Sequence, residues 1–237
     1  MKTYLFDFDG TLVDSMPTYS SIMLHILDSN HIKYDDDIIK VITPLGYKGT
    51  AQYFISLGIS MGQDELMKLM QDYAIQEYTN RIPAKKYVIP VLNKLKDQGI
   101  DLNILTASPH VMLDPCLKRL GIFDLFTNIW SCDDFNMTKS NPAIYTMAAQ
   151  RMGVSVDEVL FIDDNYNANR TAKYAGMCVC GTYDKSSKDH IQEMKNISDY
   201  YIYDFRELLA LQAGQQNIKA HIEYPILGRD KSGYQLT

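Results

Sequence analysis

Residues Tyr4–Ser15 read YLFDFDGTLVDS and decide the fold of this chain. The run before Asp7 is short and apolar and stops at Gly10, which predicts a buried strand that ends at two carboxylates. Asp7 and Asp9 lie two residues apart, and because side chains alternate along a strand, both can point to one side. Ligands of an open α/β sheet bind beyond the carboxyl ends of its strands, where these acids fall. Two carboxylates repel each other in a desolvated crevice, so the pair indicates a divalent metal, although a capped turn would account for the segment taken alone.

Length and composition define the class of protein. The 237 residues suit one large domain or a core domain with a smaller one, and a hydrophobic content of 46% allows a sizeable core. The net charge of −6 and the pI near 5.3 argue against nucleic-acid binding, because phosphate backbones require a basic face. Neither a signal peptide nor a membrane-spanning run is predicted, so we expect a cytoplasmic protein without a membrane partner. Cys178 and Cys180 form the only close cysteine pair, which favours buried thiols over a zinc site.

The chain divides into two periodic patterns and a polar tail. After the first strand the spacing of apolar residues is helical, and no strand is convincing up to about residue 81. From Pro83 to about Phe205 helix and strand signals alternate, which predicts parallel crossovers and an α/β fold with a doubly wound parallel sheet. We therefore expect a core domain of residues 1–15 and 83–212, a small α-helical cap domain of residues 16–82, and a C-terminal tail of residues 213–237 with no assigned role.

Polar groups gather at further strand and helix ends. One predicted strand ends in Thr106 and Ala107, and a later one ends in Asp163-Asp164. Lys139 lies just ahead of a helix whose free N–H groups would point the same way. If these ends meet the first strand at one edge of the sheet, they supply a nucleophile, an acid/base, phosphate donors and a metal cage. That set matches phosphoryl transfer to a carboxylate.

These motifs follow the order of the haloacid dehalogenase (HAD) superfamily of hydrolases, which the chain resembles from residue 1 to about residue 205. The similarity is to the branch with a helical C1-type cap after the first strand, typified by phosphoglycolate phosphatases and β-phosphoglucomutase. The first motif is complete from Asp7 to Ser15, and the others are Thr106, Lys139 and Asp163-Asp164. The resemblance implies a Rossmann-like core that carries the cap as an insertion.

The resemblance also implies a role for each motif residue. Asp7 would be the nucleophile that becomes an aspartyl-phosphate, and Asp9 would protonate the leaving oxygen and then activate water, a contribution of ~10²–10⁴-fold in rate. Thr106 and Lys139 would complete the catalytic set. Mg²⁺ would bind oxygens of Asp7, Asp9 (through its backbone carbonyl), Asp163 and Asp164. The expected substrate and phosphate contacts are Phe8, Gly10, Thr106, Ala107, Lys139 and, from the cap, Lys48.

The presence of Asp9 narrows the reaction class. The dehalogenase branch lacks this acid because displacing halide needs no proton donor there, so phosphoryl chemistry is favoured. We expect a phosphatase that hydrolyses a small phosphorylated metabolite, such as phosphoglycolate, a sugar phosphate or a nucleoside monophosphate. A β-phosphoglucomutase-like mutase is the alternative, weakened because Tyr19 stands where that enzyme has a histidine. A non-catalytic binding relative would have lost a motif residue, and none is lost.

Substrate choice is expected to come from the cap, because the core motifs handle only the phosphoryl group. The segment Pro44–Thr50 combines two glycines with a cation and an aromatic ring, which predicts a mobile loop. Within it, Lys48 is the candidate contact for an anionic leaving group, although a solvated turn lysine fits equally well. Hinges are expected near residues 15–19 and 82–87, and closure of the cap would exclude water. The oligomeric state and the apolar patch at Tyr224–Leu227 stay unassigned.

Overall fold

The computed structural model describes residues 1–212 and contains one six-stranded parallel sheet. The strand order is β3-β2-β1-β4-β5-β6, so β1 is central and the chain changes direction across the sheet between β1 and β4. Crevices for ligands form at such switch points. The predicted doubly wound parallel sheet is confirmed, and its strands are β1 (Thr3–Phe6), β2 (Asp101–Thr106), β3 (Asn128–Ser131), β4 (Val159–Asp163), β5 (Cys178–Thr182) and β6 (Tyr200–Ile202).

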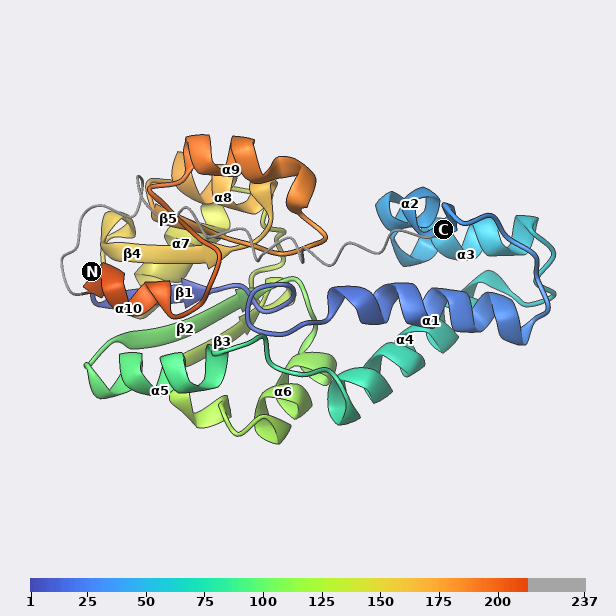
Figure 1. Cartoon of the computed structure of the whole chain (residues 1–237), viewed down its shortest axis with the longest axis horizontal. Coiled ribbons are helices and arrows are strands. Elements are labelled where there is room, and N and C mark those ends of the chain that lie inside the picture. The colour runs from blue at the N-terminus through green and yellow to red at the C-terminus, as the bar shows by residue number, and fades with distance from the viewer. Residues whose placement is uncertain (213–237) are drawn as a thin grey trace, which may run out of the picture.

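Helices cover both faces of the sheet (Figure 1). One face packs against α5 (Val88–Asp97), α6 (His110–Arg119) and α10 (Glu207–Gln212), and the other against α7 (Ala143–Met152) and α8 (Tyr166–Tyr174). Helix α9 (Ile191–Ile197) contacts α8 and β6. Alternate residues of β1 serve the two faces, because Tyr4 and Phe6 belong to one buried cluster and Leu5 to the other. This burial on both faces explains why the strands are almost continuously apolar.

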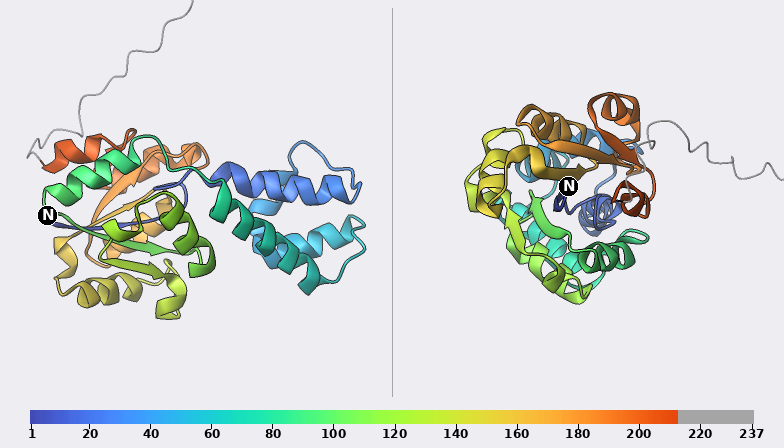
Figure 2. Two further views of the ribbon diagram at one scale, coloured as in Figure 1. Left: turned by 90° about the horizontal axis from the view of Figure 1, so that it is seen from below. Right: turned by 90° about the vertical axis from the view of Figure 1, so that its left-hand side faces the viewer.

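A second group of helices lies beyond the carboxyl ends of the strands (Figures 1 and 2). These cap helices are α1 (Met16–Ser29), α2 (Ile38–Ile42), α3 (Gly46–Ser56) and α4 (Gln63–Asn80). They share their own buried cluster, which includes Met23, Phe54 and Met70. Residues 16–82 contain no strand, as the periodicity indicates. The division of the chain into a core domain and a cap domain remains our prediction.

The predicted loop at Pro44–Thr50 is wrong. A short 3₁₀ turn (Thr43–Leu45) is followed directly by α3, so Lys48 lies in the first turn of a helix. Tertiary packing overrides the two glycines, because Ala51 and Phe54 of α3 are fully buried in the cap cluster. Gly49 has a packing role, since a Cβ there would lie 2.8 Å from the Leu45 Cβ.

The two connections between core and cap run side by side. The Asp14 N–H donates to the Pro83 carbonyl (3.0 Å) and the Lys85 N–H donates to the Leu12 carbonyl (2.9 Å). Further 3₁₀ turns link core elements at η2 (Phe123–Leu125), η3 (Cys132–Phe135), η4 (Val156–Glu158) and η5 (Lys188–His190).

Three further sequence-based expectations concern the cysteines, membrane-spanning helices and the C-terminal tail. All four cysteines carry free thiols, and Cys178 and Cys180 lie on β5. No helix within residues 1–212 is both long enough and apolar enough to cross a membrane. The tail of residues 213–237, with its patch at Tyr224–Leu227, lies outside the described residues.

Phe54→Ala tests whether the cap cluster holds the helices together. The Phe54 ring is fully buried, so its loss should lower the free energy of unfolding by ~3–5 kcal/mol in urea denaturation. Gln52→Ala, at an exposed position of the same helix, should change it by less than about 0.5 kcal/mol. Equal effects of the two substitutions would contradict the buried cluster.

Candidate active site

The pairing of β1 with β4 brings the first two acids together. Phe6 lies opposite Ile162 in the parallel register, and the Asp7 N–H donates to the Ile162 carbonyl (2.9 Å). Asp7 and Asp163 are therefore neighbours at the carboxyl ends of two adjacent strands. Asp163 is fully buried and the Asp7 side chain is 10% exposed.

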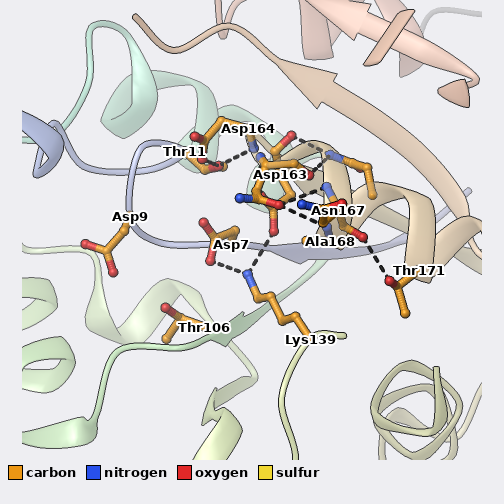
Figure 3. A network of polar contacts seen from close by, with 12 residues as sticks. Asp7, Asp9, Thr11, Thr106, Lys139, Asp163, Asp164, Asn167, Ala168 and Thr171 are labelled. Atoms are coloured by element: carbon orange, nitrogen blue, oxygen red, sulfur yellow. Dashed lines mark hydrogen bonds and ion pairs between the residues drawn. The ribbon is translucent and has the colours of Figure 1, made fainter. Parts of the chain in front are cut away.

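Lys139 reaches this pair from the segment before α7 (Figure 3). Its ammonium donates to Asp7 Oδ1 and, at 2.8 Å, to Asp163 Oδ2. The side chain is only 14% exposed. The Tyr145 hydroxyl of α7 lies 3.0 Å from the Lys139 carbonyl and 3.1 Å from the Ala168 carbonyl of α8, so the backbone of this lysine lies against α7.

Asp164 is the third acid and is held by hydroxyl groups. Its Oδ1 accepts from the Thr11 hydroxyl (3.1 Å) and its Oδ2 accepts from the Ser187 hydroxyl (2.9 Å). Gly10 allows the close approach, because a Cβ there would lie 2.7 Å from Asp164 Oδ1 and the backbone φ is +74°. The Gly10 of the first motif is thus explained by packing against the last motif.

Three neighbouring carboxylates, of which two contact the Lys139 ammonium, leave a surplus of negative charge. Burial, with the Asp163 charge next in size, raises the pKa of Asp7 well above its usual value, and Lys139 opposes the rise. Burial and Asp163 also raise the pKa of Asp164 to about 7. Burial lowers the pKa of Lys139, but Asp163 and Asp7 outweigh it, and the net shift is upward.

The same three acids fit a hard divalent cation. One oxygen each from Asp7, Asp163 and Asp164 lies within 4.8 Å of the others, and all three residues are buried. A cation would compensate the charge that otherwise favours protonated carboxyls, and carboxylate oxygens are the ligands that Mg²⁺ prefers. Both oxygens of Asp163 already accept hydrogen bonds, from Lys139 and from the Asn165 N–H (2.7 Å), and both oxygens of Asp164 accept from hydroxyl groups, so protein donors orient these two acids.

Asp9 lies apart from this cluster. Figure 3 shows its carboxylate outside the network of dashed contacts that joins Asp7, Lys139 and Asp163. Its Oδ1 accepts from the hydroxyls of Ser15 (2.7 Å) and Tyr78 (2.5 Å), and its Oδ2 accepts from the Ser108 hydroxyl (2.5 Å). Tyr78 comes from α4, so a cap helix holds this core acid directly. Burial and then the Asp9 charge raise the pKa of Tyr78, which keeps this donor protonated.

The remaining predicted phosphate contacts lie around the same strand ends. Thr106 is buried at the end of β2, and its hydroxyl accepts from the Ser108 N–H (3.1 Å). Ala107 is exposed beside it. The Phe8 ring is fully buried and stacks on Tyr78, so only its backbone can face a ligand.

Two predicted contacts find less support in the geometry. The Gly10 N–H already donates to the Val13 carbonyl (3.0 Å). Lys48 is exposed on α3, whereas its neighbour Tyr47 turns inward and lies 6.4 Å from the Tyr19 ring. The roles of Gly10 and Lys48 as substrate contacts stay predictions.

Sequence patterns alone did not single out several groups that complete the site. Tyr78 sits inside an ordinary helical segment, and Ser187 lies in a polar stretch rich in turn formers. Neither has a local signal, because each reaches the acids from a distant part of the chain. Thr11 and Ser15 belong to the first motif, and their spacing from the acids is the one signal that points to them.

Known proteins are similar to this chain in sequence and in fold. The family model of haloacid dehalogenase-like hydrolases matches residues 1–176. The candidate phosphatase YhcW of Bacillus subtilis (strain 168) is 30% identical over 185 residues, covering 76% of this chain and 82% of that protein. A phosphoglycolate phosphatase of Colwellia psychrerythraea (strain 34H) is 29% identical over 221 residues, covering 88% and 95%.

A solved structure agrees at the level of the fold. The crystal structure of a candidate β-phosphoglucomutase from Thermotoga maritima matches with a TM-score of 0.78 at 20% identity, covering 90% of this chain and 99% of that one. The protein therefore belongs to the haloacid dehalogenase-like hydrolases, and the expectation of an enzyme of this family with a Rossmann-like core is confirmed.

Asp164→Asn should make the metal-free protein more stable at pH 8. The folded pKa of about 7 lies above the unfolded value of about 4, so this carboxylate costs stability once the pH exceeds both. Asparagine removes that cost, and the gain in free energy of unfolding should be roughly 2–4 kcal/mol at pH 8 in EDTA. The gain should shrink as the pH falls from 8 to 5, because the wild-type group then takes up its proton.

Asp97→Asn provides the matched control, since Asp97 is exposed at the end of α5. It should leave the denaturation midpoint nearly unchanged at both pH values. A loss of stability in Asp164→Asn at pH 8 would contradict the crowding of charge described above.

Proposed function

We propose that this hydrolase is a Mg²⁺-dependent phosphatase that acts on a small phosphorylated metabolite through an aspartyl-phosphate on Asp7. The observation that carries the proposal is the buried contact of Lys139 with both Asp7 and Asp163 at the switch point of the sheet. A carboxylate fixed by a lysine at the carboxyl edge of a parallel sheet is suited to attack phosphorus. The relatives named as phosphatases support the same activity.

Asp7 is the proposed nucleophile because its position is fixed on two sides. Its backbone is paired to β4 and its Oδ1 is held by Lys139, so its other oxygen can be aimed at a phosphoryl group. Lys139 also contributes positive charge where the phosphoryl oxygens would lie. Thr106, at the end of the neighbouring strand, is the proposed hydroxyl partner of one of those oxygens.

Asp9 is the proposed acid and base. It would donate a proton to the leaving oxygen when Asp7 attacks, and would take a proton from the water that later hydrolyses the acyl phosphate. The hydroxyls of Ser15, Tyr78 and Ser108 keep its carboxylate at the boundary between core and cap, where a leaving group would enter.

Asp7, Asp164 and Asp163, with the Asp9 backbone carbonyl, are the proposed holders of Mg²⁺. When bound, the ion supplies positive charge that lowers the repulsion between the nucleophile and the phosphate. The fit of the acids to a divalent cation supports this assignment.

The cap helices are the proposed source of substrate choice. Tyr19 and Tyr47 face one another within the cap, and Asp9 is among the charges that raise the pKa of Tyr47 after burial and Tyr19. The Tyr47 hydroxyl is therefore within electrostatic reach of the proposed acid. Residues 16–82 would move on the paired connections near Asp14 and Lys85, and the free thiols and composition favour a cytoplasmic setting.

Asp7→Asn should abolish phosphate release. The amide is a poor nucleophile, whereas the fold should persist because asparagine keeps the size of the side chain. We would measure inorganic phosphate released from phosphoglycolate, hexose phosphates, nucleoside monophosphates and β-glucose 1-phosphate, with Mg²⁺ and with EDTA. Wild-type release that needs Mg²⁺ and vanishes in Asp7→Asn would support the proposal.

Two outcomes would redirect it. Conversion of β-glucose 1-phosphate into glucose 6-phosphate without net phosphate release would favour the mutase. No turnover of any compound by the wild type would favour a ligand-binding role for the same site.

Lys48→Ala tests the proposed cap contact separately. If Lys48 binds an anionic leaving group, KM should rise for substrates with a second negative charge and should stay constant for those with a neutral leaving group. Lys40→Ala is the control on α2. Unchanged KM values for every substrate would remove Lys48 from the binding site and leave the core chemistry untouched.

A further inference from the structure

The loop after β5 reaches into the acid cluster. The Ser187 hydroxyl donates to Asp164 Oδ2 at 2.9 Å, although the two residues come from different strand ends. Asp164 is buried, and its other oxygen accepts from Thr11. The orientation of this carboxylate therefore depends on a segment outside the four motifs.

Lys85 ties that loop to the connection between core and cap. Its ammonium donates to Asp184 Oδ2 (2.9 Å), to the Tyr183 carbonyl (2.8 Å) and to the Gly10 carbonyl (2.5 Å). The Lys85 side chain is 21% exposed and that of Asp184 is 7% exposed, so the ion pair is shielded from water. One ammonium thus joins three segments: the loop after β1, the loop after β5 and the return from the cap.

Asp184 in turn orders the loop locally. Its Oδ1 accepts from the Ser186 N–H (2.8 Å) and from the Ser186 hydroxyl (2.6 Å). The next residue is Ser187, so the turn that Asp184 stabilises also delivers the hydroxyl to Asp164. A continuous path of contacts leads from Lys85 through Asp184 to Ser187.

We propose that Ser187 and Lys85 are positioning residues that set the affinity of the acid cluster for its divalent cation. The inference rests on the proposed function for the identity of the metal ligands. Ser187 orients Asp164, and Lys85 acts through the loop that carries Ser187. Groups that orient metal ligands typically change metal affinity by ~10–100-fold when removed.

Replacing Lys85 tests the inference, because a positioning role and a purely electrostatic role predict opposite changes in metal affinity. Its positive charge lies close enough to lower the pKa of Asp164, against the larger effects of burial and Asp163, and to repel a cation. If charge alone mattered, replacing Lys85 with a neutral residue would tighten metal binding. If Lys85 acts by positioning, the same replacement weakens it.

The experiment is titration calorimetry of the full chain with MgCl₂, after removal of metals with EDTA. We expect the Kd for Mg²⁺ to rise about 10-fold or more in Ser187→Ala, to rise in Lys85→Met, and to recover in Ser187→Thr, which keeps the hydroxyl. The double variant should be weakened by less than the product of the two single effects, because both act through one loop. Lys86→Met is the matched control, since Lys86 is the exposed neighbour whose ammonium lies 4.8 Å from the centre of the Tyr87 ring.

Several outcomes would overturn the inference. They are a tighter or unchanged Kd in Lys85→Met, an unchanged Kd in Ser187→Ala, and an effect of Lys86→Met equal to that of Lys85→Met. Thermal unfolding in EDTA identifies any variant that has lost its fold. Should Lys85→Met unfold, the Kd of Ser187→Ala alone tests the inference, because this substitution removes one half-buried oxygen and leaves the rest of the loop intact.

Failure of this inference is distinguishable from failure of the proposed function. A wild type that binds Mg²⁺ but releases no phosphate would end the phosphatase proposal while the Kd values still test Ser187 and Lys85. A wild type that binds no Mg²⁺ would overturn the inference together with the metal assignment.

Discussion

The crowding of three buried carboxylates, two of them held by the Lys139 ammonium, is the constraint on which the rest of this site depends. Asp7, Asp163 and Asp164 would repel one another if all were ionised, and Lys139 neutralises only part of their charge. The raised pKa values of Asp7 and Asp164 express this imbalance. Such an arrangement is costly to the metal-free protein, and the surrounding fold must hold it in place.

The parallel sheet provides that support. Its central strands are buried on both faces and paired in a register that leaves no freedom for the strand ends, so Asp7 and Asp163 stay adjacent whatever their charge. Hydroxyl and amide groups engage the remaining oxygens, as Thr11 does for Asp164. The repulsion among these acids costs stability. Burial of apolar side chains in the two core clusters offsets that cost.

The cap helices reach the site through polar contacts as well as through the chain connections. Tyr78 of α4 donates to Asp9, and Lys85 joins the return connection to the loops after β1 and β5. The Tyr78 contact crosses from a cap helix to a core acid, and the Lys85 contacts hold the connection through which the chain returns from the cap. A change in the position of the cap would therefore be felt first at Asp9 and at the loop that carries Ser187.

The sequence by itself determined the alternation of helices and strands, the helical insertion after β1 and the residues that gather at the strand ends. These follow from local periodicity and from the rule that parallel strands present their carboxyl ends at one edge. The first motif also contained Thr11 and Ser15. Ser15 contacts the nearby Asp9 of the same motif, and Thr11 contacts Asp164 at the same edge of the sheet.

Only the tertiary structure decided the helical state of Gly46–Thr50, the donors that surround Asp9, and the path from Lys85 to Ser187. Glycines in α3 argue locally against a helix, and burial of Phe54 outweighs them. Tyr78, Lys85 and Ser187 come from separate segments and carry no local pattern. Their roles arise from packing between distant segments. Tyr78 lies 69 residues from Asp9 in the sequence, Lys85 lies 99 residues from Asp184, and Ser187 lies 23 residues from Asp164.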